Sequence, residues 1–263
     1  MRKYLLRSTA LGYLLIILIG PLAMTIWRTL GDLDGAWAAI TSHNTLLAFK
    51  LTLYVTAIAV PINTVFGVVC GLVIVRSTLP GRGILNAFVD LPLALSPVVV
   101  GLSLVVLYGA NGWFGFFDDH GIRILYAVPA IVLATVFVSL PFVAREVVPT
   151  LREIGDDQEQ AARTLGASGW QTFWRITLPS IRWAVVYGVV LTAARCIGEF
   201  GAVLVVSGNV EGKTQTATLR VDDAYQFAYG NYAPAYGIAL VLAAMAVLVL
   251  VAMTLVKPRE EAT

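Results

Sequence analysis

Six long apolar runs dominate the pattern of hydrophobic and polar positions along the chain. They cover residues 10–27, 46–75, 84–109, 124–148, 183–206 and 233–256, and polar loops separate them. A helix needs about 20 mostly apolar residues to cross a bilayer, and each run is close to or above that length. The pattern therefore predicts an all-α, polytopic membrane protein with six transmembrane helices.

Prolines and glycines inside these runs indicate where the helices are irregular or closely packed. The second run is long enough to cross with tilt, or to break near Pro61. The third contains Pro92 and Pro97, so we expect a kinked or unwound segment near its start. Gly67 and Gly71 form a G-x-x-x-G pattern, which suits close packing of the second helix against a neighbour.

The loops alternate in charge along the chain. One side has Arg2, Lys3, Arg7, Arg76, Arg82, Arg145, Arg152, Arg163, Arg175, Arg182, Lys257 and Arg259, and the other has only Arg28, Arg123, Lys213 and Arg220. Basic loops remain in the cytoplasm, so both termini are predicted to be cytoplasmic. The first run follows basic residues as in a signal peptide, but its length favours a retained helix. The chain is therefore expected to comprise a first helix with its outer loop (1–44), a membrane domain (45–257) and a cytoplasmic tail (258–263).

Composition supports a membrane protein and excludes several other classes. The 263 residues are 58% hydrophobic and 13% charged, with a mean hydropathy of +0.81. Soluble domains have about a quarter charged residues, so the excess apolar surface must face lipid. A net charge of +2 gives no reason to expect a nucleic-acid partner. Cys70 and Cys196 lie in apolar runs as small buried residues, and His43 and His120 lack the spacing of a metal site.

The longest loop on the basic side, residues 149–182, has the signals of two short helices. Asp157 suits the first turn of one helix, and Gly166 can end it in a left-handed conformation. Ser168 and Gln171 have the spacing of a capping box that starts a second helix, and Pro179 is expected to close the stretch.

This loop has two interpretations when only its residues are considered. Ala161 and Ala162 are small enough for another protein to approach closely, and Trp170, Phe173 and Trp174 offer apolar anchors. An amphipathic hairpin lying on lipid headgroups would have the same features. The residues alone leave both interpretations open.

A longer motif in the loop resembles one found in the permeases of bacterial ABC importers. Their pattern is E-A-A, three residues, G, nine residues, then I-x-L-P. The matching positions are Gln160, Ala161, Ala162, Gly166, Ile176, Leu178 and Pro179. Gln160 stands where the pattern has glutamate, and the adjacent Glu159 is a candidate substitute. In that family, of the type I importer fold, the loop is a coupling helix that fits a groove on an ATP-hydrolysing subunit. The resemblance implies that ATP and Mg²⁺ bind to that partner, and that this chain has no catalytic residue, metal site or cofactor.

Arg195 and Glu199 are ionisable residues inside the fifth apolar run. Four residues apart, they would share one helix face. Charges at this depth usually face a pathway or a partner. They are candidates for lining the pathway of an anion, with the carboxylate weakening the attraction enough for release. A structural ion pair between helices explains them equally well.

Asp90 lies in the proline-containing third run, in the stretch D-L-P-L-A-L-S-P that also contains Ser96. Broken backbone inside a membrane must be buried in protein or line a cavity, so both residues are pathway candidates. The alternative for Asp90 is a cap close to the cytoplasm.

Three stretches resemble, more narrowly, the W-type permeases of sulfate/thiosulfate importers. They are residues 90–101, residues 141–149 (P-F-V-A-R-E-V-V-P) and residues 194–209. The resemblance implies an inner-membrane permease with four kinds of partner: two ATP-binding subunits, a sister permease, an external sulfate-binding protein and membrane lipid. Molybdate and tungstate permeases share G-E-F-G-A (198–202), so they are the alternative.

Two further functional classes are less consistent with the sequence. A stand-alone ion-coupled carrier usually has repeated halves, and none is evident. An intramembrane enzyme needs a nucleophile and base or a metal site within the spans, and neither histidine lies in one.

Overall fold

The computed structural model describes residues 7, 9, 12–78 and 80–256, and this part of the chain contains helices and no strands. The helices before the third apolar run are η1 (Leu15–Ile19), α2 (Gly20–Leu30), α3 (Leu33–Thr41) and α4 (His43–Arg76). The middle of the chain forms α5 (Arg82–Ala94), α6 (Pro97–Tyr108), α7 (Phe116–Asp119), α8 (Val128–Ser139) and α9 (Pro141–Ile154). The remainder forms α10 (Asp157–Thr164), α11 (Gly169–Thr172), η2 (Phe173–Thr177), α12 (Leu178–Ile197), α13 (Gly201–Ser207), α14 (Ala217–Gln226) and α15 (Ala233–Val256).

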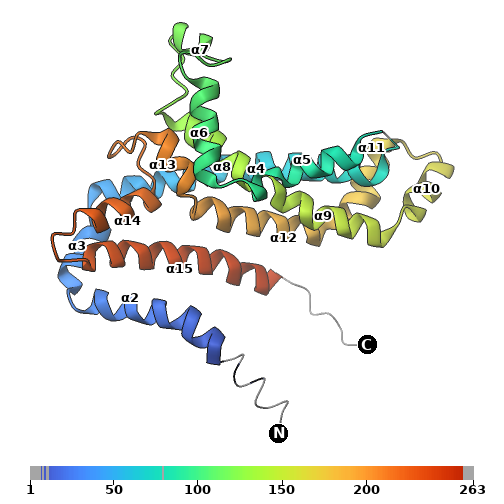
Figure 1. The fold of residues 1–263 in the computed structure, drawn as a ribbon. Coiled ribbons are helices and arrows are strands. Elements are labelled where there is room, and N and C mark those ends of the chain that lie inside the picture. Colours follow the sequence, from blue (N-terminus) through green and yellow to red (C-terminus); the bar gives the residue numbers. More distant parts are fainter. Residues whose placement is uncertain (1–6, 8, 10–11, 79, 257–263) are drawn as a thin grey trace.

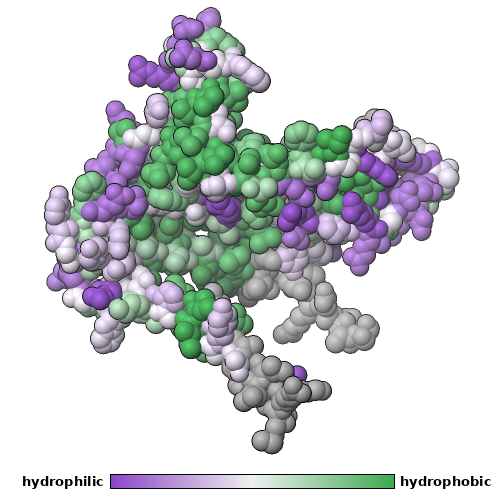
Figure 2. Space-filling model, in the orientation of Figure 1, coloured by the Kyte–Doolittle hydropathy of each residue, from purple (hydrophilic) through white to green (hydrophobic). Residues whose placement is uncertain are grey.

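Most of the long helices lie along one direction. Figure 1 shows α10 and α11 at one end of this elongated arrangement, with α3, α13 and α14 at the opposite end. Helix α6 turns away from the others and leads to α7. Figure 2 shows an apolar surface over α6 and a hydrophilic surface at the α10 end.

The helices match the predicted spans in number if one bent pair is counted as a single span. Five helical stretches are long and apolar enough to cross a membrane: Gly12–Leu30, His43–Arg76, Val128–Ile154, Gly169–Ile197 and Ala233–Ala252. The pair α5 and α6 provides a sixth, bent by 108°. The predicted start of the first span at residue 10, and the residues Arg2, Lys3, Lys257, Arg259 and 258–263 used to orient the termini, lie outside the described part of the chain.

Prolines have different effects in the second and third spans. Helix α4 continues through Pro61 without a break. The third span breaks at Leu95 and Ser96, immediately before Pro97 in the first turn of α6. Proline disfavours the helical region for the residue that precedes it, and Ser96 has a ψ of 136°. The predicted irregularity is therefore confirmed, but it is a sharp bend in the middle of the span and not near its start.

The fifth span differs from its prediction at both ends. The predicted helix over 183–206 is wrong, because α12 runs from Leu178 to Ile197 and α13 starts separately at Gly201. The prediction that Pro179 closes the loop is also wrong. Pro179 lies in the first turn of α12, where a missing N–H is tolerated, and α11 and η2 lead directly into that helix.

Glycines allow α4, α9 and α12 to pack closely. A Cβ atom on Gly67 would lie 2.6 Å from the Cβ atom of Val143, and one on Gly188 would lie 2.7 Å from its Cα atom. Gly71 faces Val147 in the same way. Val143 of α9 therefore lies between glycines of two neighbouring helices, which confirms the close packing predicted from the G-x-x-x-G pattern.

A buried polar bridge joins α4, α8 and α12. The Asn63 side-chain amide donates to the Ser139 hydroxyl (2.8 Å) and to the Val136 carbonyl (3.1 Å). Ser139 also lies 3.3 Å from the Cys196 sulfur. Cys70 and Cys196 are free and buried, as expected.

Candidate functional site

The loop between α9 and α12 has the predicted helix ends. The Gly166 N–H donates to the Arg163 carbonyl and the Ala167 N–H to the Ala162 carbonyl, which is the Schellman arrangement. Gly166 has a φ of +85°, the left-handed conformation that this ending requires. Ser168 and Gln171 form both hydrogen bonds of a capping box at the start of α11.

The motif residues in α10 divide between an outer and an inner face. Gln160, Ala161 and Gly166 are exposed, whereas Ala162 is buried. The inward direction of Ala162 shows that it serves packing of the loop, so Ala161 is the small residue that a partner can approach.

Large apolar side chains are exposed beside this helix. Leu165 is 88% exposed, Trp170 is 71% exposed and Trp174 is 51% exposed. Phe173, predicted as a third anchor, instead packs against the buried cluster of α4, α9 and α12. Sequence reasoning missed Leu165, although a leucine just before a left-handed glycine is held at the tip of the loop. The exposed candidates for anchoring a partner are therefore Leu165, Trp170 and Trp174.

The end of the motif belongs to the spanning helix. Ile176 lies in the π-helical segment η2, and Leu178 and Pro179 form the first turn of α12. Leu178 packs against the same buried cluster as Phe173. This part of the motif connects the loop to the membrane helix.

Glu159 is turned into the protein and is held by two other elements. Its side chain is 8% exposed and pairs with Arg76 at the end of α4, with 3.0 Å between Nε and Oε2. The Thr177 hydroxyl of η2 donates to the second carboxylate oxygen, Oε1, at 2.9 Å. A substitute for the missing motif glutamate would need an exposed carboxylate, and that of Glu159 is engaged within the chain.

Arg195 and Glu199 form the expected ion pair, but they do not share a helix face in the middle of one span. Arg195 is in the last turn of α12, and Glu199 lies in the break before α13. The Nη1 and Oε2 atoms are 2.7 Å apart, and the side chains are 30% and 2% exposed, respectively. Within the described residues, this pair is the one polar contact of the Arg195 guanidinium, so its other N–H groups are available to a ligand.

The break that contains Glu199 is stabilised from three directions. Its carboxylate accepts from the Ala202 N–H (3.0 Å) in the first turn of α13, besides pairing with Arg195. The Thr218 hydroxyl of α14 donates to the Glu199 backbone carbonyl at 2.6 Å. Glu199 thus fixes the end of α12 against both α13 and α14.

The two broken spans meet. A Cβ atom on Gly201 would lie 3.1 Å from the Pro97 Cβ atom, so the start of α13 contacts the start of α6. Gly101, one turn into α6, approaches the Ala202 carbonyl in the same way. Ser96 precedes this contact, with a side chain that makes no capping hydrogen bond. The break at Ser96 in the third span and the break at Glu199 in the fifth span therefore lie next to each other.

Asp90 lies in a separate place, on the side of α5 that faces α9. Its carboxylate pairs with Arg145, with 2.9 Å between Oδ1 and Nε. The two residues line a small pocket of about 150 Å³ to which neither break contributes. The pair joins two of the stretches on which the narrower resemblance rests, and its position favours a link between helices over a pathway contact.

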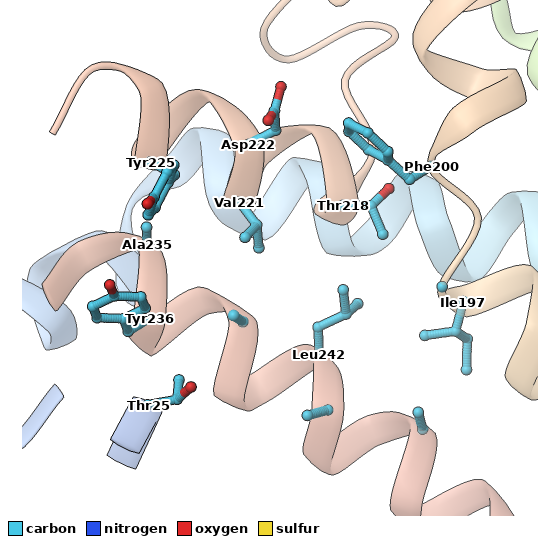
Figure 3. Close-up of a pocket in the computed structure, with 14 residues that line it drawn as sticks. Thr25, Ile197, Phe200, Thr218, Val221, Asp222, Tyr225, Ala235, Tyr236 and Leu242 are labelled. Carbon is cyan, nitrogen blue, oxygen red and sulfur yellow. The ribbon is translucent and has the colours of Figure 1, made fainter. Parts of the chain in front are cut away.

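A larger pocket lies between α2, α14 and α15. Its volume is about 610 Å³, and Figure 3 shows Val221 and Tyr225 on α14 facing Tyr236 and Leu242 on α15, with Thr25 of α2 beside them. Ile197, Gly198 and Phe200 from the break after α12 also line it, whereas Arg195 and Glu199 do not. The lining is mostly apolar, so the pocket suits another apolar chain better than an anion.

Comparisons with known proteins identify the family of this fold and sequence. Residues 63–261 match the model of the binding-protein-dependent transport system inner membrane component. The chain is 47% identical to the sulfate transport system permease protein CysW of Synechocystis sp., covering 98% of this chain and 93% of that protein. It is 37% identical to the permease CysT of Escherichia coli, covering 96% and 91%.

The fold is also that of solved ABC transporters. A bacterial alginate ABC transporter, solved with its periplasmic protein, matches with a TM-score of 0.80 at 18% identity, covering 100% of this chain and 96% of that one. The methionine ABC transporter MetNI in an inward-facing conformation gives a TM-score of 0.57, also at 18% identity, covering 81% and 96%. The protein therefore belongs to the family of inner-membrane components of binding-protein-dependent transport systems.

Proposed function

We propose that this chain is the permease subunit of an ATP-driven importer for sulfate and thiosulfate. The observation that carries the proposal is the near full-length identity to sulfate permeases, 47% over 261 residues. The chain forms part of the translocation pathway and does not hydrolyse ATP itself. Two ATP-binding subunits, a sister permease and an external sulfate-binding protein complete the transporter.

The geometry of the breaks supports a pathway for a divalent anion. Arg195 keeps donors free while Glu199 neutralises part of its charge. A site built in this way holds a dianion weakly enough to release it, as transport requires. Two adjacent breaks in spanning helices are also the kind of backbone from which membrane transporters build their substrate sites. We assign Arg195, Glu199 and Ser96 to this pathway.

The loop around α10 is proposed to dock on the ATP-binding subunit. Its exposed Ala161 permits close approach, and Leu165, Trp170 and Trp174 present apolar side chains of the kind that anchor interfaces. Gln160 lies on the exposed face of the same helix. Nucleotide binding by the partner would move this loop and switch the pathway between outward and inward openings, provided the two states bind nucleotide differently.

Uptake of radiolabelled sulfate tests the substrate. Cells that lack this chain and cells that regain it are compared, with excess thiosulfate or molybdate as competitor. We expect restored uptake that thiosulfate blocks and molybdate affects little. Sulfate uptake that never depends on the chain, with molybdate accumulation that does, would show that the substrate assignment is wrong and the family assignment right.

A further inference from the structure

Arg76 connects the ends of two membrane helices. It is the last residue of α4, where a cation is favoured by the partial negative charge of the helix end. Its Nη1 donates to the Leu151 carbonyl at 3.0 Å and its Nη2 to the Gly155 carbonyl at 2.5 Å. Both carbonyls belong to the C-terminal end of α9, where backbone acceptors lack partners within the helix. The guanidinium of this α4 residue therefore donates hydrogen bonds to carbonyls at the end of α9 that lack partners within the helix.

Gly155 gives the backbone the direction that this contact needs. It follows α9 with a φ of +65° and a ψ of −167°, a conformation that is essentially restricted to glycine. The chain turns there and starts α10 two residues later. The first turn of α10 is thereby placed against the end of α4.

Glu159 completes the arrangement from α10. Its Oε2 accepts from Arg76 Nε and its Oε1 from the Thr177 hydroxyl, so both carboxylate oxygens are engaged. Side-chain exposures of 17% for Arg76 and 8% for Glu159 place the pair largely out of solvent. Arg76, Glu159 and Thr177 therefore tie α10 to α4, to α9 and, through η2, to α12. We name these three residues the clasp.

Helix α10 has no other ion pair to the membrane helices in the described part of the chain. Helix α12, which the clasp reaches through Thr177, carries Arg195 in its last turn. Figure 1 shows α10 at one end of α12 and α13 at the other. The clasp therefore forms a direct contact between α10 and the start of α12, at the other end of which Arg195 lies.

We propose that Arg76 and Glu159 are positioning residues that transmit movement of the ATPase-docking loop to α4 and α12. The inference rests on the proposed function of that loop. It assigns Glu159 a role inside the permease in place of a contact with the ATPase. An arginine is required because its three nitrogens are spread over a planar group and reach three separate acceptors, whereas the three N–H donors of a lysine share one nitrogen.

The test uses the transporter complex purified through this chain and reconstituted in lipid nanodiscs. ATP hydrolysis is measured with and without sulfate-loaded binding protein, and the amount of ATP-binding subunit in each complex is recorded. Glu159→Gln and Arg76→Gln are expected to retain the ATP-binding subunit but to lose about fivefold or more of the stimulation. Arg76→Lys is expected to behave like Arg76→Gln, and Thr177→Val to lose less because only the α12 contact is cut.

Matched controls are available at the end of α9. Arg152→Gln and Glu153→Gln make the same changes of charge at exposed positions, and both are expected to keep full stimulation. The ratio of stimulated to basal activity separates transmission from stability, since partial unfolding lowers both rates together.

Normal stimulation in Glu159→Gln and Arg76→Gln, or full rescue by Arg76→Lys, would overturn the inference and leave the proposed function intact. So would loss of the ATP-binding subunit from these variants, because the pair would then serve assembly. A wild-type complex that contains no ATP-hydrolysing subunit would contradict the proposed function itself, and the inference with it.

Discussion

The close approach of α4 and α9 predicts different outcomes for alanine substitutions at two glycines of α4, Gly67 and Gly71. In Gly71→Ala, the new methyl group would lie 2.7 Å from the Val147 Cγ1 atom but 3.4 Å from its Cβ atom. In Gly67→Ala, it would lie 2.6 Å from the Val143 Cβ atom and 2.8 Å from the Ala144 backbone nitrogen. Ordinary carbon contacts are about 3.5–4.0 Å, so either substitution must push the helices about 1 Å apart.

The two clashes differ in what can relieve them. Each substitution overpacks the core and is expected to cost about 1–3 kcal/mol. Val147→Ala removes the Cγ1 atom that clashes with the methyl group added at position 71, and the remaining contact of 3.4 Å is tolerable. Val143→Ala removes the Cγ1 atom, 2.8 Å from the methyl group added at position 67, but leaves the contacts with the Cβ atom at 2.6 Å and with the Ala144 backbone nitrogen at 2.8 Å. Rotation offers no escape, since valine in a helix has one strongly preferred rotamer.

Two double-mutant cycles test this difference, with the free energy of unfolding of each variant measured in a single detergent. Gly71→Ala with Val147→Ala is expected to show a favourable interaction of about 1 kcal/mol or more, within the usual range for contacting residues. Gly67→Ala with Val143→Ala is expected to show less than about 0.5 kcal/mol. Gly83→Ala on α5 has open space around its Cβ position and serves as the control. If Gly71→Ala is as stable as Gly83→Ala, or if both cycles show equal rescue, the packing argument is refuted.

Three further predictions concern the proposed pathway, the proposed docking loop and the contact between Asp32 and Asn231. Arg195→Gln removes a charge-assisted contact worth about 1.5–3 kcal/mol and should reduce sulfate uptake about ten- to hundredfold. The ATP-binding subunit should still be captured. Unchanged uptake would mean that the ion pair of Arg195 and Glu199 has a structural role alone. Gly166→Ala places a side chain at a φ of +85° at a cost of about 1–2 kcal/mol and should reduce capture of that subunit. The control is Gly169→Ala, which has open space and no positive φ, and equal capture by both variants would contradict the expectation. The side chain of Asn231, and then the Gly35 N–H, hold the pKa of Asp32 below its ordinary value of 3.8. Folding therefore favours the ionised carboxylate. Its contribution to stability is fully present above pH 3.8 and is lost as the pH falls from 3.8 through the lowered pKa. The difference in melting temperature between the wild type and Asn231→Ala should shrink as the pH is lowered through this range. A constant difference would contradict the link between Asn231 and the ionised form of Asp32.

The number of spans and the ends of the short helices could be predicted from the sequence because both follow local rules. Length and hydropathy determine what can cross a bilayer, and Pro97 disfavours the helical conformation at the preceding residue. Gly166, Ser168 and Gln171 act within a few residues of one another. Each of these features depends on residues that are neighbours in the chain.

The break after Arg195 could not be predicted in this way. Helix α12 ends at Ile197 and α13 starts at Gly201, and the break between them is held by Glu199 contacts with Ala202 and Thr218. The inward direction of Glu159 depends on Arg76, which is 83 positions away. A basic residue at the end of an apolar run is the only sequence signal for that partner, and it fits a cytoplasmic loop equally well. These contacts arise from tertiary packing.

Reconstitution in proteoliposomes tests most directly whether the chain works as one subunit of an ATP-driven importer. Sulfate accumulation is measured with the chain alone, with its co-purified subunits, and with those subunits, ATP and loaded binding protein together. Accumulation only in the last case is the predicted result. Sulfate transport by the chain alone, without an ATP-hydrolysing subunit, would contradict the account.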